Sequence, residues 1–153
     1  MTRRLALALL LLLLPAVAGA TSTAPTVSAH DAWIRLLPAN LPAAGYVRLD
    51  NHTDHSARLV LVSSDAFGSI MLHQSLRDGG SQRMRMVDGM DIPAHGSAAL
   101  EPGSYHLMLE TPRHAIKLGE RVVMTLHFDD GSELPVAFEV RPANASGPST
   151  PGK

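Results

Sequence analysis

Short runs in which apolar and polar residues alternate make up most of the chain after residue 26. Alternation of this kind is typical of β-strands with one buried face, and Gly, Pro, Asn and Asp residues separate the runs. Beyond residue 20 no long stretch has the period of an amphipathic helix. We therefore predict strands at residues 27–36, 45–51, 58–63, 70–74, 83–86, 97–100, 104–110, 121–128 and 134–141.

The clearest element is the run from Val122 to Phe128, in which apolar residues dominate. The turn residues 129–132 lead from it into residues 134–140, which predicts a closing hairpin. Many short strands at regular spacing indicate an all-β sandwich or barrel. We predict one such domain over residues 27–141.

The two ends of the chain differ from this domain in composition. Arg3 and Arg4 precede an apolar run at 5–14, and Ala18-Gly19-Ala20 resembles a cleavage site, so residues 1–20 are predicted to be a signal peptide. The apolar run is shorter than the roughly 20 residues that a membrane span needs. Residues 21–26 are expected to be a flexible lead-in, and residues 142–153, rich in Pro, Ser and Gly, a disordered tail.

Composition then excludes several classes of protein. The chain has no cysteine, so we expect neither disulfides nor a lipid-modified cysteine. Without the two arginines of the predicted signal, 11 basic residues face 14 acidic ones, and the basic residues are scattered. A nucleic-acid-binding protein would show a basic stripe, so we expect no nucleic-acid partner. The mature chain has no further hydrophobic span, and we expect it to cross no membrane.

The candidate chemistry lies in two histidines and two methionines: His73, Met84, His106 and Met108. Imidazole binds several transition metals, whereas the soft thioether of methionine selects Cu(I). Taken singly, each of these residues would be an ordinary histidine of a sheet or methionine of a core. Together, and without cysteine, they indicate a Cu(I) site in an oxidising compartment.

Local structure can bring these donors together. His106 and Met108 are two residues apart in a predicted strand and share one face. A turn centred on Asp78-Gly79 would set His73 opposite Met84, whereas a turn centred on Gly79-Gly80 would set it opposite Met86. The segment could equally be an open loop, and Met71, two residues before His73, could share its face.

No enzymatic constellation competes with the metal site. The sequence contains no Gly-x-Ser-x-Gly elbow, no evident pair of carboxylates and no Gly-rich phosphate loop after a strand. A blue-copper centre requires a cysteine ligand, which is missing. We therefore expect a carrier and not an enzyme.

The pattern His-x10-Met-x21-His-x-Met, formed by His73, Met84, His106 and Met108, resembles the signature of the periplasmic copper chaperones of the PCu(A)C family. The flanking segments that also resemble this family are residues 31–35, 44–46 with Asn51, 92–94 and 102–109. The likeness covers about residues 27–141. Many members carry a tail rich in His and Met, whereas residues 142–153 contain neither, so a second copper site in the tail is not expected.

The resemblance implies a cupredoxin-like β-sandwich or barrel that binds one Cu(I) through those four residues in the periplasm. It also implies delivery of copper to the copper-A centre of cytochrome c oxidase, with subunit II as the candidate acceptor, and exchange with thiol-type copper chaperones. Two alternatives stay open at this point. One is a metal-free secreted β-sandwich that binds a partner protein or a glycan, and the other is a copper oxidase or reductase with an open metal position.

Overall fold

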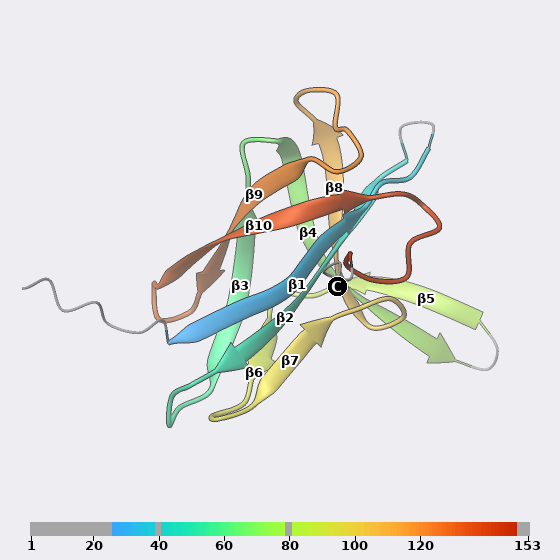
Figure 1. Ribbon diagram of the computed structural model, residues 1–153. Helices are drawn as coiled ribbons and strands as arrows, with labels where there is room; N and C mark the ends of the chain where they lie inside the picture. Colours follow the sequence, from blue (N-terminus) through green and yellow to red (C-terminus); the bar gives the residue numbers. More distant parts are fainter. Residues whose placement is uncertain (1–25, 39–40, 79–80, 150–153) are drawn as a thin grey trace, which may run out of the picture.

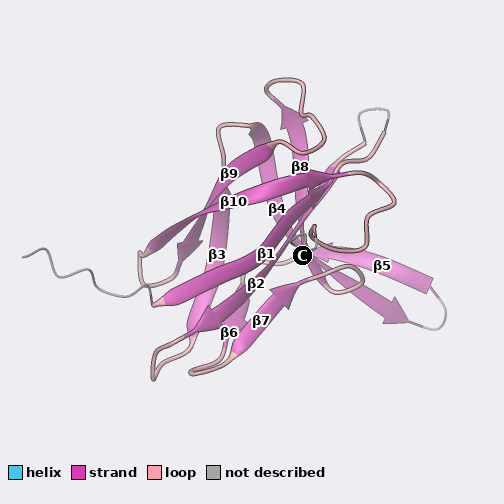
Figure 2. Cartoon of the chain, viewed as in Figure 1, coloured by secondary structure: helices cyan, strands magenta, loops and turns pink. Residues whose placement is uncertain are grey.

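The computed structural model describes residues 26–38, 41–78 and 81–149. In these residues every regular element is a strand (Figure 2). The strands are β1 (Val27–Arg35), β2 (Ala43–Asn51), β3 (Ala57–Ser63), β4 (Phe67–Asp78), β5 (Ser81–Met86), β6 (Met90–Ile92), β7 (Ser97–Leu100), β8 (Tyr105–Pro112), β9 (Arg121–Phe128) and β10 (Glu133–Arg141). The prediction of an all-β protein is confirmed.

The strands form one sheet in the order β5-β4-β8-β7-β2-β1-β10-β9-β3-β6, with a further pairing of β8 and β2. Most neighbours are antiparallel, while β1 with β10 and β7 with β8 are parallel. The sheet curls around its own inner face, as Figure 1 shows. Strand β5 lies at one edge of the sheet and β6 at the other.

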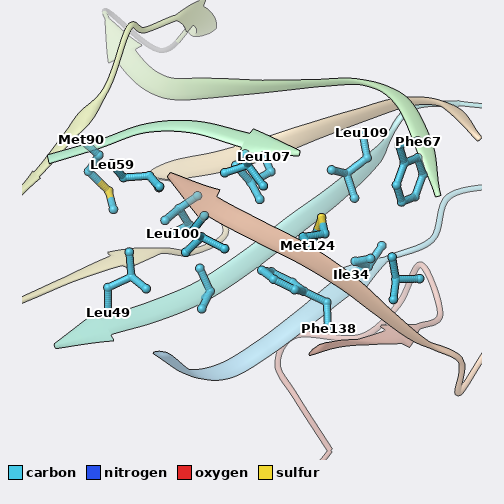
Figure 3. Packing of buried hydrophobic residues seen from close by; sticks show 14 of the residues in the cluster. Ile34, Leu49, Leu59, Phe67, Met90, Leu100, Leu107, Leu109, Met124 and Phe138 are labelled. Atoms are coloured by element: carbon cyan, nitrogen blue, oxygen red, sulfur yellow. The ribbon is translucent and has the colours of Figure 1, made fainter. Parts of the chain in front are cut away.

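The core fills the inside of the curled sheet (Figure 3). Alternation places it there: in β9, Val122, Met124, Leu126 and Phe128 are buried while the residues between them are more exposed. Met124, Leu126 and Phe138 are all 0% exposed. Apolar residues from β1, β2 and β8 complete the same cluster, so one core serves the whole domain.

The observed strands confirm one predicted feature and add one strand that the sequence did not predict. The closing hairpin is confirmed, because β9 and β10 are antiparallel with Leu126 opposite Leu134. Strand β6 was not predicted, because three residues are too few for an alternating pattern to be recognised. It pairs with β3 and buries Met90 and Ile92 in the core.

The ends of the chain lie partly outside the described residues. The predicted signal peptide, residues 1–20, and the lead-in up to residue 25 are outside them, as are residues 150–153 of the predicted tail. Residues 142–149 contain no strand, yet Arg35 Nε donates to the Ala145 carbonyl at 3.2 Å. Ser149 donates to a Glu139 carboxylate oxygen at 2.6 Å. Composition alone did not predict these contacts.

Candidate metal centre

Strands β5, β4 and β8 are neighbours, and their two faces differ in chemistry. On the inner face Leu107 and Leu109 of β8 are buried in the core, and Leu72 of β4 packs against them. The alternate positions of the same strands point away from this core. We call this outer surface the donor face; it carries Met71, His73, Met84, Met86, His106 and Met108.

Strand register fixes how these side chains are arranged. On β4 and β8, His73 is directly opposite His106 and Met71 is directly opposite Met108. The two imidazole rings lie with centroids 5.7 Å apart and are inclined at 78°, an edge-to-face arrangement. Directly opposed side chains in a sheet are within contact distance. The outer face of two strands therefore presents two nitrogen donors and two sulfur donors as adjacent pairs.

The third strand, β5, adds two more thioethers. Asp78 is paired with Ser81, so the register is the one that a turn centred on residues 79–80 predicts. His73 consequently faces Met86, and Met84 faces Ser75. Met84 lies diagonally from His73 on the same face. The alternative in which Met84 stands directly opposite His73 is wrong.

A hollow of about 350 Å³ opens on the donor face. Met84, His106 and Met108 line it together with Ser75, so three of the four predicted donors share one cavity. His73 contributes from the adjoining position, where its ring contacts that of His106. The remaining wall comes from β1, β2 and the two loops beside them, through Arg35, Leu37, Leu41, Pro42, Ala43, Ala44, Tyr46, Pro102 and Gly103.

His106 is the buried member of the set, with 9% of its surface exposed. Its Nδ1 lies 3.4 Å from the Ser104 carbonyl, a position from which an N–H would donate to that oxygen. Histidines that bind metals commonly donate one ring N–H to a carbonyl, which leaves the other nitrogen free for the metal. Burial lowers the pKa of His106 below its ordinary 6.5, and nearby His73 acts in the same direction, while the Ser104 carbonyl opposes both. The neutral, metal-binding form is thereby favoured.

His73 carries a buried ring nitrogen without a partner. Its Nδ1 has no hydrogen-bond partner among the described residues, although buried polar atoms normally have one. A metal ion bound by an imidazole nitrogen would satisfy such an atom. Together with the soft sulfur donors on either side, this orphaned nitrogen fits a monovalent copper ion as cargo.

None of the six donor residues is a carboxylate. The described residues contain no group of three or more His, Cys, Asp or Glu side chains placed to hold a metal. Hard cations such as Mg²⁺ and Ca²⁺ prefer oxygen ligands, so a donor face of imidazole and thioether does not suit them. The chemistry of the site is that of soft donors.

Sequence reasoning missed the wall of the hollow formed by Arg35 and Tyr46. The Arg35 guanidinium carbon lies 5.2 Å from the Trp33 ring centroid and 5.3 Å from that of Tyr46. The two rings are themselves 4.6 Å apart. Burial raises the pKa of Tyr46 above its ordinary 10.0, and Arg35 opposes this shift. No motif in the sequence indicated that Tyr46 borders the hollow.

Comparison with solved structures identifies the class of domain to which this protein belongs. The fold matches the apo PmoF2 PCuAC domain with a TM-score of 0.66 and 22% identity, over 81% of this chain and 96% of that domain. It also matches the solution structure of CuI-DR1885 from Deinococcus radiodurans, with a TM-score of 0.64 and 32% identity over 84% of this chain and 85% of that one. The protein is therefore a PCuAC-type domain with a cupredoxin-like β-barrel fold.

The family follows from sequence. Residues 27–140 match the family model described as "Putative lipoprotein LpqE-like", and the chain belongs to this family. A relative from Leifsonia xyli, "Putative lipoprotein Lxx21020", is 31% identical over 116 residues, which cover 75% of this chain and 69% of the relative. "Uncharacterized protein RP573" from Rickettsia prowazekii is 34% identical over 99 residues, which cover 64% of this chain and 55% of that protein. The resemblance drawn from the four-residue pattern is confirmed at the level of the family.

The described residues include no helix that is long and apolar enough to span a membrane.

Proposed function

We propose that this protein is a Cu(I) carrier that holds one ion on the donor face through His73, Met84, His106 and Met108. The observation that carries the proposal is the convergence on one hollow: Met84, His106 and Met108 line it, and His73 is paired with His106 beside it. The likeness to a Cu(I)-loaded protein of 32% identity supports the same metal. Each donor comes from a strand, so the ladder of backbone hydrogen bonds positions it.

The ligand types suit a carrier in an oxidising compartment. Thioethers have no proton to lose, so protons compete for this site only through the two imidazoles. Thioethers also cannot form disulfides, which thiolates do readily when copper changes oxidation state. We propose the periplasm as the compartment, reached through the predicted signal peptide at residues 1–20.

The acceptor is proposed from chemistry and from the resemblance. A site of two imidazoles and two thioethers lacks the thiolates that bind Cu(I) most strongly, so release to an acceptor with cysteine ligands is favourable. The copper-A centre of cytochrome c oxidase is the acceptor that the PCu(A)C resemblance implies. Thiol-type copper chaperones would be the second kind of partner.

The direct test is competition for Cu(I) between the purified protein and a chromogenic chelator. The wild-type protein should bind one equivalent, and a His106→Ala/Met108→Ala variant should lose tight binding. A His55→Ala variant is the matched control, because His55 lies in the exposed loop 52–56, away from the donor face. Unchanged one-to-one binding in the double variant would refute the assignment.

The acceptor needs a separate test. Cytochrome c oxidase activity in a deletion strain at low copper should fall and should recover when copper is supplied in excess. Full oxidase activity at low copper in that strain would contradict the proposal that the copper-A centre is the acceptor.

A further inference from the structure

The donor face carries more soft donors than one Cu(I) needs. Besides the four proposed ligands, it presents Met86 of β5 and Met71 of β4. Cu(I) is satisfied by three or four ligands, and the two additional thioethers therefore need another explanation. Their positions differ: Met71 is half-buried opposite Met108, whereas Met86 is 68% exposed.

Backbone pairing fixes the position of Met86 on the donor face, although its side chain is exposed. The backbone is held on both sides: Arg85 is paired with Gln74, and Val87 N–H donates to the Leu72 carbonyl at 2.9 Å. The Arg85 guanidinium also donates to Gln74 Oε1, at 2.9 and 3.2 Å, on the other face of the hairpin. Met86 therefore does not belong to a loose hairpin end. Its thioether is presented directly opposite His73.

The proposed ligands differ in how far solvent reaches them, because Met84 is 61% exposed and His106 is buried. His106 is 9% exposed, so an incoming acceptor cannot reach an ion from that side. The hairpin of β4 and β5 extends from the body of the sheet (Figure 1), and its residues Ser75 and Met84 line the hollow. Met84 lines the hollow with His106 and Met108, whereas Met86 does not line it and lies directly opposite His73. An acceptor that approaches the donor face from solvent therefore meets an exposed Met86 directly opposite His73.

We propose that Met86 is the exchange ligand of the copper site. This inference rests on the proposed function and adds a step to it. As Cu(I) enters or leaves, a bond from copper to the Met86 sulfur forms while the bond to the buried His106 nitrogen breaks, and His73 keeps its bond throughout. Copper stays monovalent and no proton moves, because a thioether has none to give. The acceptor's ligand then replaces Met86 at the exposed position.

A ligand that acts only during exchange affects rates and leaves the equilibrium nearly unchanged. In a Met86→Leu variant we expect the Cu(I) affinity to stay within about threefold of the wild type, since the four inner donors remain. Loading from a Cu(I)–chelator complex and release to a chelator should both become about tenfold slower. A Met84→Leu variant, in contrast, should lose affinity.

The experiment combines stopped-flow transfer to bicinchoninate with equilibrium competition, on the wild type and on Met86→Leu, Met86→His and Met84→Leu. Met86→His restores a Cu(I) donor at the same position and should recover the transfer rate. Equal melting temperatures of the copper-free proteins exclude misfolding as the cause. A transfer rate in Met86→Leu equal to the wild type would overturn the proposal, and so would a loss of affinity as large as that of Met84→Leu.

A second readout separates this proposal from the proposed function. Protein labelled with ¹³C at the methionine methyl groups is titrated with Ag(I), a redox-inert analogue of Cu(I). Shifts at the Met84 and Met108 methyls, together with broadening of the Met86 methyl signal at substoichiometric Ag(I), where the ion exchanges between molecules, support both proposals. Shifts at Met84 and Met108 without any broadening at Met86 overturn only the exchange role. No shift at any of the three overturns the copper site itself.

Discussion

At the scale of single residues, the site depends on how each donor is placed relative to solvent. His106 is buried with one nitrogen towards the Ser104 carbonyl, and His73 has a buried Nδ1 without a partner among the described residues. Met84 is 61% exposed. The same four-residue pattern thus contains two nitrogens shielded from water and a sulfur open to it. In the proposed carrier, the shielded nitrogens would hold the ion and the exposed Met84 would let an acceptor reach it.

The residue pattern gave candidate donors but not their contacts. The spacing of His73, Met84, His106 and Met108, and its resemblance to the PCu(A)C signature, selected them as candidates. It did not identify Tyr46 or Arg35 as walls of the hollow. Their position depends on pairings between strands far apart in the sequence, such as Trp33 with Tyr46 and Ala44 with Met108.

Gly89 is a residue whose substitution should cost stability. A Cβ at this position would lie 2.7 Å from Arg58 Nε and 2.9 Å from the Leu59 carbonyl oxygen. The backbone oxygen belongs to β3 and cannot move freely, and Arg58 is engaged with Asp88 and Asp91 at 3.0 and 2.7 Å. Gly89→Ala should therefore lower the free energy of unfolding by about 1–3 kcal/mol.

Urea unfolding measures this loss. The matched control is Gly147→Ala, because a Cβ there would have nothing within 4 Å. A Gly89→Ala protein as stable as this control would contradict the crowding that the structure predicts.

At the scale of elements, the β4–β5 hairpin decides which methionine faces which histidine. Two registers were compatible with the sequence, because Asp78-Gly79 and Gly79-Gly80 are both acceptable turn centres. The structure has Asp78 opposite Ser81, and this shift of register moves Met86 into the position opposite His73. Turn chemistry could not settle the choice, since glycine is favourable in either turn. Because this register places Met86 and Met84 at different positions relative to His73, substitutions at the two methionines can be compared to test the proposed exchange role of Met86.

The loop between β8 and β9 contains a carboxylate with a local role. Glu120 Oε1 is 3.0 Å from His114 Nε2, and Lys117 N–H donates to its Oε2 at 2.9 Å. These contacts, the one with His114 first, lower the pKa of Glu120 below its ordinary 4.5. Above pH 4.5 the carboxylate is ionised in folded and unfolded protein alike, and its stabilising contribution is fully present. As the pH falls below 4.5, the unfolded state takes up the proton first and the contribution is lost.

The prediction is a pH-dependent difference between the wild type and Glu120→Gln. The wild type should have the higher melting temperature near pH 6, and the difference should shrink as the pH falls through and below 4.5. A difference that stays constant over this range would show that the charge of Glu120 plays no part.

At the scale of the whole molecule, one curled sheet encloses the core and leaves the donor face outside it. The all-β class and most strands followed from alternation, which also accounts for the burial of Met124 in β9. The order of strands did not follow, because it includes distant pairings such as β1 with β10 and β4 with β8. The latter pairing is the one that sets His73 against His106. The class of fold could therefore be predicted from the sequence, and candidate donors could be named, but the arrangement that brings these residues to one face could not.

Stability and copper binding should be separable, because the core and the donor face lie on opposite sides of the sheet. Met124→Ala removes a side chain that is 0% exposed and should cost about 2–5 kcal/mol of unfolding free energy through the cavity that it leaves. At a temperature where the variant is still folded, its Cu(I) affinity should match that of the wild type. A loss of Cu(I) affinity in the folded variant would show that core packing also determines the geometry of the site, and would contradict this separation.

The central claim is that two imidazoles and two thioethers gather around a single Cu(I). The most direct measurement is X-ray absorption at the copper edge of the Cu(I)-loaded protein, with wild type and His106→Ala/Met108→Ala compared. For the wild type the account predicts a monovalent edge with a mixed shell of nitrogen and sulfur scatterers, at about one copper per chain, and for the double variant the loss of this shell. A shell without sulfur, or the same shell in both proteins, would contradict the account.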